Sequence, residues 1–195
     1  MYTPTGVTKT FPKRGGAVIA VRDVDLSIAD GEWLAIQGRT GSGKTTMLQL
    51  LGAMHRPDHG AVSLGGQDLA RLPEQRLAGV RGATIGFVFQ TFNLIPTLSA
   101  QENVEAALVP RRLADARRQA RALAALDSVG LADRAHHLPA ELSGGQQQRV
   151  GIARALVKDP KVLLADEPTG NLDTDTRDEI MSLLQTLWGN AASPW

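Results

Sequence analysis

One eight-residue segment constrains the fold of this chain more than any other. It fits the pattern G-x-x-x-x-G-K-[ST] and consists of Gly38, Arg39, Thr40, Gly41, Ser42, Gly43, Lys44 and Thr45. The apolar run Trp33–Ile36 before it is typical of a strand buried on both faces, and Thr46–Leu51 after it reads as a helix. Glycines between a strand and a helix let backbone N–H groups turn toward an anion at the helix N-terminus. The segment therefore predicts a phosphate-binding loop in an α/β fold.

Two side chains of this loop have chemistry that suits a nucleotide. Lys44 is expected to reach the β- and γ-phosphates, and the Thr45 hydroxyl is expected to bind Mg²⁺. Nucleotide kinases, GTPases, recombination ATPases and transport ATPases all share such a loop. The loop alone thus predicts nucleotide binding without choosing between these classes.

A second apolar run ends in two acids. Val162–Ala165 reads as a buried strand, and Asp166 and Glu167 follow it directly. Open α/β sheets bind ligands at the carboxyl ends of their strands. We expect Asp166 to hold Mg²⁺ through water, and Glu167 to act on the attacking water as general base or orienting group.

The most informative stretch is Leu142–Arg149, which reads Leu-Ser-Gly-Gly-Gln-Gln-Gln-Arg. Ser143 is a favourable helix N-cap, and the apolar residues after Arg149 continue a helix. Gly144 and Gly145 leave the N-terminus of this helix bare, so that its N–H groups and dipole can meet an anion. The stretch predicts a second anion site.

Composition excludes several classes of protein. The chain has 195 residues, a net charge of +1 and no cysteine. These values suit one domain, lend no support to nucleic-acid binding as the main activity, and exclude disulfides and thiolate metal sites. No apolar run approaches the roughly 18 residues of a membrane span, and the first residues lack a signal-peptide pattern. We expect a soluble, cytoplasmic protein.

The middle of the chain predicts a helical insert in an α/β core. The stretch from Glu102 to about Val129 is rich in alanine, leucine and arginine and has no strand signal. Helical spacing relates four of its residues, and Gly130 is a suitable stop; the four are Leu113, Ala116, Ala120 and Leu123. Five arginines there indicate a solvated helix face rather than a nucleic-acid patch, because acids interrupt them and no aromatics interleave; they are Arg111, Arg112, Arg117, Arg118 and Arg121.

The phosphate loop, the Leu142–Gln146 stretch and the Asp-Glu strand end, in this order, resemble the ATP-binding cassette (ABC) ATPase family. The resemblance covers nearly the whole chain. It implies a P-loop NTPase core, about residues 1–90 and 143–195, with a helical subdomain at about 91–142. It also implies that two cassettes pair head to tail, so that each ATP lies between the phosphate loop of one and Ser143–Gly145 of the other.

The same resemblance assigns further residues. Gln90 matches the glutamine that contacts Mg²⁺ or the attacking water, and Asp173 matches an acid that crosses the dimer interface. Phe11 falls near an aromatic position that stacks on adenine. The implied catalytic residues are Glu167 and Gln90, and the implied Mg²⁺ ligands are Thr45, Gln90 and Asp166. The implied ATP contacts are the phosphate loop, Thr46, the residues Ser143, Gly144, Gly145 and Gln146, and also Phe11 and Asp173.

Two longer segments, Phe89–Pro96 and Glu167–Asp173, resemble one subgroup of the family. Members of this subgroup serve macrolide and peptide export, lipoprotein release and a cell-division complex. The resemblance implies an integral membrane permease as partner and a peripheral location on the cytoplasmic face of the inner membrane.

Three other functions remain open at this point. A DNA-repair or chromosome-type ABC ATPase also carries a Ser-Gly-Gly motif, but the insert of residues 91–141 has no cysteine and no sustained heptads. A small-molecule kinase would leave Leu142–Arg149 without a role. A cell-division regulator that moves no substrate is the remaining alternative within the family.

The chain departs from the family pattern after its last helix. A complete cassette would continue into a buried strand that ends in a histidine near the γ-phosphate. Here all four histidines precede residue 138, and the chain reads Gly-Asn-Ala-Ala-Ser-Pro-Trp from Gly189 to Trp195. We expect the core sheet to lack at least one strand, and ATP binding to survive better than hydrolysis.

Overall fold

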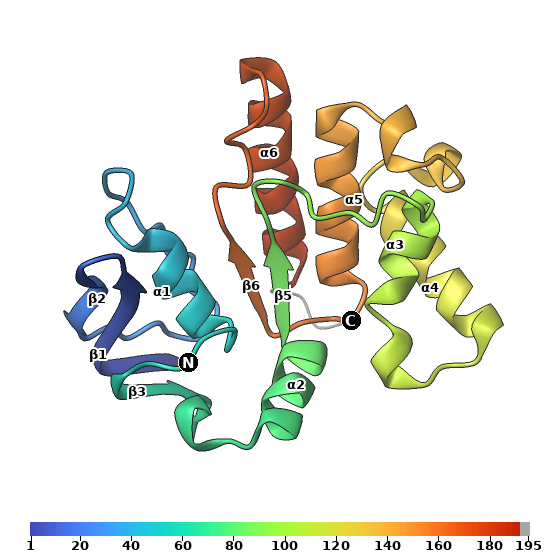
Figure 1. Cartoon of the computed structure of the whole chain (residues 1–195). Helices are drawn as coiled ribbons and strands as arrows, with labels where there is room; N and C mark the ends of the chain where they lie inside the picture. Colours follow the sequence, from blue (N-terminus) through green and yellow to red (C-terminus); the bar gives the residue numbers. More distant parts are fainter. Residues whose placement is uncertain (192–195) are drawn as a thin grey trace. The chain divides into compact units, whose positions relative to one another are not determined.

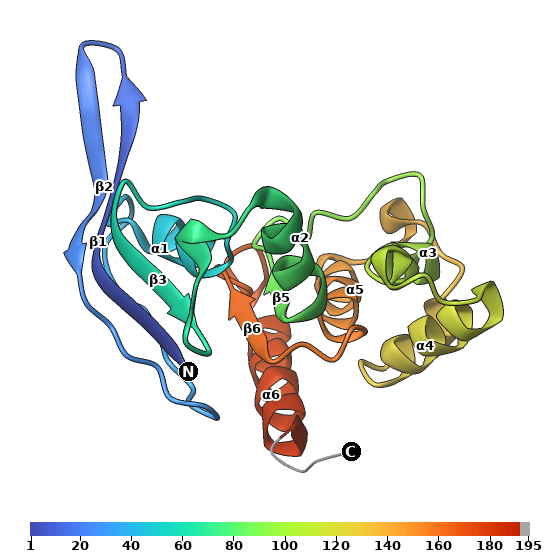
Figure 2. The ribbon, with the colours of Figure 1, turned by 90° about the horizontal axis from the view of Figure 1, so that it is seen from below.

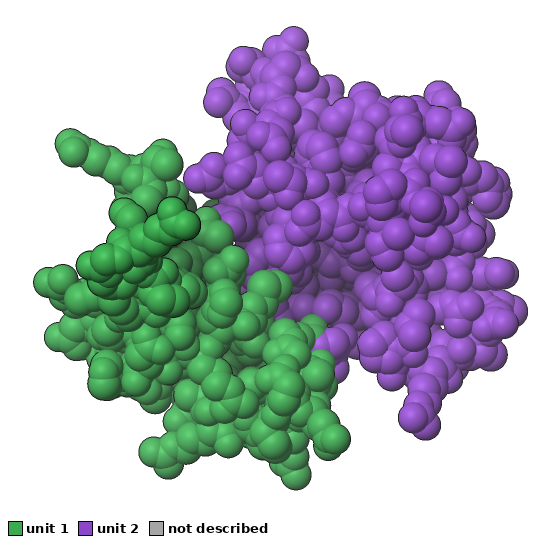
Figure 3. All heavy atoms as spheres, in the orientation of Figure 1, with its two compact units in different colours: residues 1–81 green, residues 82–195 purple. Residues whose placement is uncertain are grey.

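A computed structural model describes residues 1–191, which form two compact units. The first unit spans Met1–Arg81 and the second begins at Gly82 (Figure 3). No helix within residues 1–191 combines the length and the apolar character that crossing a bilayer requires. The expectations for the chain beyond residue 191 lie outside the described residues.

The first unit is an antiparallel sheet with helices beside it (Figure 1). The strand order is β2-β1-β3-β4. Its elements are β1 (Tyr2–Lys13), β2 (Gly16–Val24), α1 (Lys44–Leu51), β3 (His59–Leu64), β4 (Gln67–Asp68), the 3₁₀ helix η1 (Leu69–Arg71) and α2 (Glu74–Ala83).

Strands β1 and β2 form a long hairpin (Figure 2). Lys13 pairs with Gly16, so two residues make the turn, and Gly15 adopts φ +85° there. A two-residue hairpin turn needs such a left-handed conformation, which glycine tolerates without steric cost. The sequence pattern did not indicate β1, because its apolar residues do not alternate regularly.

The core of the first unit lies between the sheet and α1. Leu50 and Leu51 of α1 are buried together with Val7 and Val62 of the sheet. The buried Tyr2 hydroxyl donates to the Leu51 carbonyl oxygen at 2.8 Å, and burial raises the pKa of this phenol.

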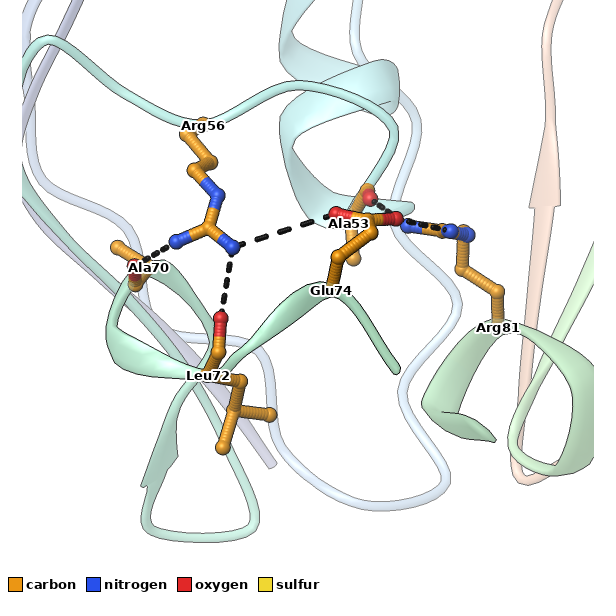
Figure 4. A network of polar contacts seen from close by, with 6 residues as sticks. All are labelled: Ala53, Arg56, Ala70, Leu72, Glu74 and Arg81. Carbon is orange, nitrogen blue, oxygen red and sulfur yellow. Dashed lines mark hydrogen bonds and ion pairs between the residues drawn. The ribbon is translucent and has the colours of Figure 1, made fainter. Parts of the chain in front are cut away.

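Two arginines of the first unit, Arg56 and Arg81, donate hydrogen bonds to backbone carbonyl groups (Figure 4). Arg56 donates to the carbonyl oxygens of Ala70 and Leu72, at 2.6 and 2.7 Å. Arg81 donates to the Ala53 carbonyl at 2.9 Å and pairs with Glu74 at 2.5 Å. These contacts fix α2 and the turn after α1, together with the buried Leu69 and Leu77.

The expected strand at Trp33–Ile36 is absent from the structure. Residues 32–39 form no ladder, and Trp33 and Leu34 are 47% and 41% exposed. An apolar run predicts burial, but a strand also needs a neighbouring strand, and the described sheet of the first unit supplies none to this run. Val24, Leu26 and Ile28 are partly buried and alternate with the exposed Asp25 and Ser27, although β2 ends at Val24.

The second unit carries a parallel pair of strands and four α-helices. The pair joins Ile85 to Val162 and, at its other end, Val88 to Ala165. Its elements are β5 (Ile85–Val88), α3 (Ala100–Ala106), η2 (Val109–Arg111), α4 (Asp115–Asp127), η3 (Ala132–Arg134), η4 (Pro139–Glu141), α5 (Gly144–Leu156), β6 (Val162–Ala165) and α6 (Thr174–Ala191).

Helix α5 is the centre of the second unit. It packs against β5, α3, α4 and α6. Val150, Ile152 and Ala153 of α5 are completely buried, together with Leu126 of α4 and Ile180 of α6. The core of this unit therefore surrounds the helix that begins at the Ser-Gly-Gly stretch.

The face of α4 that packs inward differs from the spacing noted in the sequence. Ala116, Ala120 and Leu123 are exposed, whereas Ala122 and Leu126 are buried. Contact with α3 and α5 buries the side of this helix that carries Ala122 and Leu126, and the α4 residues of the predicted stripe face outward.

The arginines of this region are only partly solvated: Arg112 and Arg117 are exposed, whereas Arg111, Arg118 and Arg121 are partly buried. Arg118 pairs with Glu105 of α3 at 3.0 Å, and Arg121 donates to the Val157 carbonyl after α5 at 3.0 Å. These bonds fasten α4 to its neighbours. Their role is tertiary contact, which neither of the two sequence interpretations included.

Candidate functional site

The phosphate loop has the backbone shape that its glycines predicted. Gly41 and Gly43 adopt φ +80° and +91°, and Gly43 is the N-cap of α1. A β-carbon on Gly43 would lie 2.1 Å from the Ala20 carbonyl oxygen of β2, so only glycine fits there. The loop thus leads directly into the N-terminus of α1.

Lys44 folds back over this loop. Its ammonium donates to the carbonyl oxygens of Gly38 and Arg39, at 3.0 and 3.2 Å. The first turn of α1 contains no acidic side chain, so no carboxylate of that turn competes for its N–H groups. Loop, lysine and helix terminus together form a cationic cradle suited to phosphate.

Gln90 and the carboxylates come to the same edge of the parallel pair. The Asp166 N–H donates to the Val88 carbonyl at 2.9 Å, which extends the ladder by one residue to Asp166. The Asn171 side chain donates to the Gln90 carbonyl at 3.0 Å, and the Gln90 amide reaches the Asn171 side-chain oxygen at 3.5 Å. The structure therefore places Gln90 beside the turn that follows Asp166 and Glu167.

Glu167 occupies an unusual backbone conformation. Its φ is +44°, in the left-handed region that residues with a β-carbon adopt at some cost. The Gly170 N–H donates to the Glu167 carbonyl at 3.0 Å and closes a tight turn. The chain therefore turns away from the strand direction after Asp166, and Glu167 is exposed.

Ser143 caps α5 as its sequence predicted. Its hydroxyl accepts the Gln146 N–H at 3.3 Å, and the Gln146 side-chain oxygen accepts the Ser143 N–H at 2.9 Å. This reciprocal capping box satisfies two backbone donors and fixes the start of the helix. The Gln147 side chain donates to the Leu142 carbonyl at 3.0 Å.

The two glycines after Ser143 have different surroundings. A β-carbon on Gly145 would lie 2.4 Å from Thr176 Cγ2 of α6, whereas one on Gly144 would have only ordinary contacts, the nearest at 3.5 Å. Gly145 is therefore needed for the close approach of α5 and α6. Packing explains the second glycine and leaves the first one to be explained by another role.

The sequence gave no reason to select Gln148, yet it belongs to this site. Its side chain is 0% exposed and donates to the Pro168 carbonyl at 2.6 Å, next to Glu167. Its side-chain oxygen has no hydrogen-bond partner among the described residues. A glutamine on the apolar side of a helix, between Gly144 and the buried run from Val150, was the available signal.

Asp173 caps α6. Its carboxylate accepts the Thr176 N–H at 3.0 Å and the Thr176 hydroxyl at 2.8 Å. These bonds, the backbone one foremost, hold the pKa of the Asp173 carboxyl below its usual value. A helix cap is thus a local role for this residue, beside the interface role that the resemblance implies.

Phe11 lies on β1 and already has aromatic and cationic neighbours. Its ring meets the His55 ring edge-on at a centroid distance of 5.5 Å, and the Lys9 ammonium lies 5.6 Å from the ring centroid. Lys9 in turn pairs with Asp58 at 2.8 Å.

Each unit therefore assembles its own part of the candidate site. The first unit holds the phosphate loop and Phe11. The second unit brings Gln90 and the two carboxylates to one strand edge and contains the capped α5 with Ser143 at its start. Oxygen donors of the kind that Mg²⁺ prefers occur in both units.

Comparison with known proteins gives a consistent result. The family model described as ABC transporter matches residues 21–170. The lipoprotein-releasing system ATP-binding protein LolD of Syntrophus aciditrophicus is 49% identical over 191 residues, or 96% of this chain and 84% of the relative. The macrolide export ATP-binding/permease protein MacB 1/2 of Paracoccus denitrificans is 47% identical over 93% of this chain, but this match spans only 27% of that longer protein.

A solved structure is similar over nearly the whole chain. The ATP-binding cassette MJ0796, in a dimeric post-hydrolysis state bound to ADP and Pi, superimposes with a TM-score of 0.89 at 43% identity. The similarity covers 96% of this chain and 83% of the other.

Proposed function

The chain belongs to the ABC transporter family of ATP-binding proteins, which are ATP hydrolases, and on this premise we propose that it works as a head-to-tail dimer that drives a membrane permease. The observation that carries the proposal is the assembly of Gln90, Asp166 and Glu167 at one strand edge, in a unit whose α5 begins with a capped, glycine-bearing turn.

The residues of the first unit fit a nucleotide. The phosphate loop offers backbone N–H donors and the Lys44 ammonium to a triphosphate. A β-carbon on Gly43 would clash with the backbone there. Phe11 is proposed to stack on the adenine. Thr45, Gln90 and Asp166 offer hydroxyl, amide and carboxylate oxygens, which fit Mg²⁺. When bound, the ion neutralises charge on the β- and γ-phosphates.

Catalysis on this proposal depends on orientation. Glu167 orients the attacking water in line with the γ-phosphate and takes up its proton, and Gln90 holds the same water from the other loop. The left-handed turn at Glu167 and the bond from Asn171 to Gln90 fix these two groups before substrate arrives. Preorganisation of this kind lowers the barrier without reorganisation during the reaction.

Dimerisation completes the site. Ser143, Gly144, Gly145 and Gln146 of one copy would contact the γ-phosphate held by the other copy, and Asp173 would lie at the same interface. The capping box uses the N–H groups of Ser143 and Gln146, so the N–H groups of Gly144 and Gly145 and the positive dipole end of α5 would meet this anion. Gly144 lacks a packing reason for its missing side chain, which supports a close approach by a ligand at that position.

The partner is proposed to be an integral membrane permease of the macrolide or peptide export type or of the lipoprotein-release type. The names of relatives matched over 93–96% of this chain support this assignment. The helical subdomain at about 91–142 would dock on the permease, and the core at about 1–90 and 143–195 would hold ATP. The protein would then lie on the cytoplasmic face of the inner membrane.

The test traps the ATP-bound dimer. Glu167→Gln keeps the size of the side chain and removes the base, so we expect ATP with Mg²⁺ to shift this variant to a dimer in size-exclusion chromatography. ADP should leave it monomeric. Adding Ser143→Arg, which places a large cation at the proposed phosphate contact, should abolish the shift while nucleotide still binds. A monomer under all conditions would contradict the sandwich arrangement.

A further inference from the structure

Arg154 of α5 holds the loop that begins at Gln90. Its guanidinium donates to the Phe92 carbonyl at 2.7 Å and to the Asn93 carbonyl at 2.5 Å. The loop runs from β5 to α3 in the second unit (Figure 1). One side chain of α5 thus contacts two consecutive peptide groups, two and three residues after Gln90.

Both carbonyls belong to residues in the left-handed region. Phe92 and Asn93 adopt φ +59° and +50°; asparagine tolerates this region, whereas a bulky residue such as Phe92 adopts it at a cost that its surroundings must offset. Inside the loop, the Asn93 N–H donates to the Thr91 carbonyl at 2.6 Å. A planar guanidinium presents two donors in a fixed geometry, so it is suited to hold two neighbouring carbonyls in such a turn.

Arg154 is partly buried, and desolvation lowers the pKa of its guanidinium, which nevertheless stays protonated. A partly buried cation needs strong acceptors, and the two loop carbonyls supply them. The arginine and the loop therefore depend on each other: moving the loop away would leave a charge without its acceptors.

The loop also lies close against α5. A β-carbon on Gly151 would lie 3.7 Å from the Phe92 carbonyl oxygen, and one on Gly144 would lie 3.8 Å from the Phe92 ring. Phe92 therefore lies along α5, with its ring near Gly144 and its carbonyl group near Gly151 and Arg154. The far end of the loop is fixed by the buried Asn103 of α3, which bonds Ile95, Leu98 and Ser99.

We propose that Arg154 is a positioning residue that clamps the Gln90 loop to α5, so that Gln90 and Ser143–Gly145 move as one piece. Displacement of the loop would then displace the start of α5, and contact of Ser143 with a phosphate would restrain Gln90. This inference rests on the proposed function for its consequence in ATP turnover, but the clamp itself is a property of the second unit alone.

Hydrogen exchange in the full chain tests the clamp without any ligand. Arg154→Met keeps the length of the side chain and removes both bonds, so we expect amide exchange at Phe92 and Asn93 to become at least about tenfold faster. The amide of Ile95, which bonds Asn103, should stay protected. Arg149→Met is the matched control: it is another α5 arginine, bonded to the Val129 carbonyl and Glu179 instead, and it should leave the loop unchanged.

ATP turnover then tests the consequence. A misplaced positioning group typically costs about 10- to 100-fold in rate, so Arg154→Met should lower kcat by this order while the Kd for nucleotide changes less than about twofold. Arg154→Lys keeps the charge and can bond one carbonyl, so we expect an intermediate kcat. Arg149→Met should keep the kcat of the unmodified chain.

The outcomes separate the two proposals. Unchanged exchange at Phe92 and Asn93 in Arg154→Met would overturn the clamp. Faster exchange with an unchanged kcat would also overturn it as a positioning device and leave Arg154 a structural residue. If ATP with Mg²⁺ left Glu167→Gln monomeric, the proposed function would fail, and the exchange data would still decide whether Arg154 holds the loop.

Discussion

Buried polar side chains fix the loops of the second unit at the scale of single residues. Asn103 is 0% exposed; its side-chain oxygen accepts the Ile95 N–H, and its NH2 group lies within hydrogen-bond distance of three carbonyl oxygens, which share its two N–H donors. Gln148 is equally buried but has one bond, to Pro168, and an oxygen without a partner among the described residues. Such a group is sensitive to any change that adds charge or removes its donor.

Gln148→Glu should therefore destabilise the chain in a pH-dependent way. The carboxylate would be buried and would face the Pro168 carbonyl, so we expect a loss of about 3 kcal/mol in the free energy of unfolding at pH 7. Burial raises the pKa of such a carboxyl, so the loss should be smallest near pH 4 and grow as the pH rises. Gln147→Glu, at a partly buried neighbour, is the control and should lose much less; equal urea midpoints at pH 7 would contradict this account.

Asp173 should make a second pH-dependent contribution. Its pKa is lowered in the folded chain by the bonds from Thr176, so its stabilising effect is complete above its unfolded pKa of about 3.9 and is lost as the pH falls through the folded value. Asp173→Asn keeps a capping acceptor but cannot titrate. Between pH 6 and pH 3 the free energy of unfolding, measured in urea, should fall more for the unmodified chain than for the variant. Equal decreases would show that this cap contributes nothing to the acid sensitivity.

At the scale of elements, α5 links three functional segments. Its start carries Ser143, and Gln148 and Arg154 bond the loops after β6 and β5. The close approach of α5 and α6 at Gly145 belongs to the same arrangement, because Thr176 is held there by its bond to Asp173. The geometry of the site is thus set by how one helix packs.

This packing predicts different effects for the two glycines. Gly145→Ala would push its β-carbon into Thr176, whose χ1 is stiff and restrained, so we expect a loss of about 1–3 kcal/mol in stability. Gly144→Ala meets only ordinary contacts and should be neutral or stabilising by up to about 1 kcal/mol, since alanine favours helix. Thermal unfolding without nucleotide distinguishes them, and a larger loss for Gly144→Ala would reverse the assignment.

The elements also show what the sequence could predict. Short motifs specified local chemistry: the turn at Gly43, the cap at Ser143 and the carboxylates after β6 lie where their patterns placed them. Apolar runs were less informative, because burial and pairing depend on neighbours that are distant in sequence. Trp33–Ile36 forms no strand, and contact with α3 and α5 selected the buried stripe of α4. Arg154 gave no signal, since a side-chain bond to a distant carbonyl has no sequence pattern, and the only signal for Gln148 was its place on the apolar side of the helix.

At the scale of the whole molecule, the proposed ATP ligands come from both units. The phosphate loop belongs to residues 1–81, and Gln90 and Asp166 belong to the second unit. A ligand that binds only the folded state stabilises it by mass action, by about 2.7 kcal/mol at a concentration 100 times its Kd. On the proposed function, ATP with Mg²⁺ should therefore raise the thermal stability of both units together.

Lys44→Ala should remove this stabilisation. The variant loses the cation of the phosphate cradle and its bonds to Gly38 and Arg39, so its stability without ligand can differ, and the measured quantity is the shift in Tm that ATP causes. Lys13→Ala, at the exposed end of β1, is the control and should keep the full shift. Hydrogen exchange identifies the units involved: ATP should slow exchange in α1 and at Asp166 of the unmodified chain and at neither place in Lys44→Ala. Protection confined to α1 would mean that ATP binds the first unit alone, and the catalytic role proposed for Gln90 and Asp166 would then be wrong.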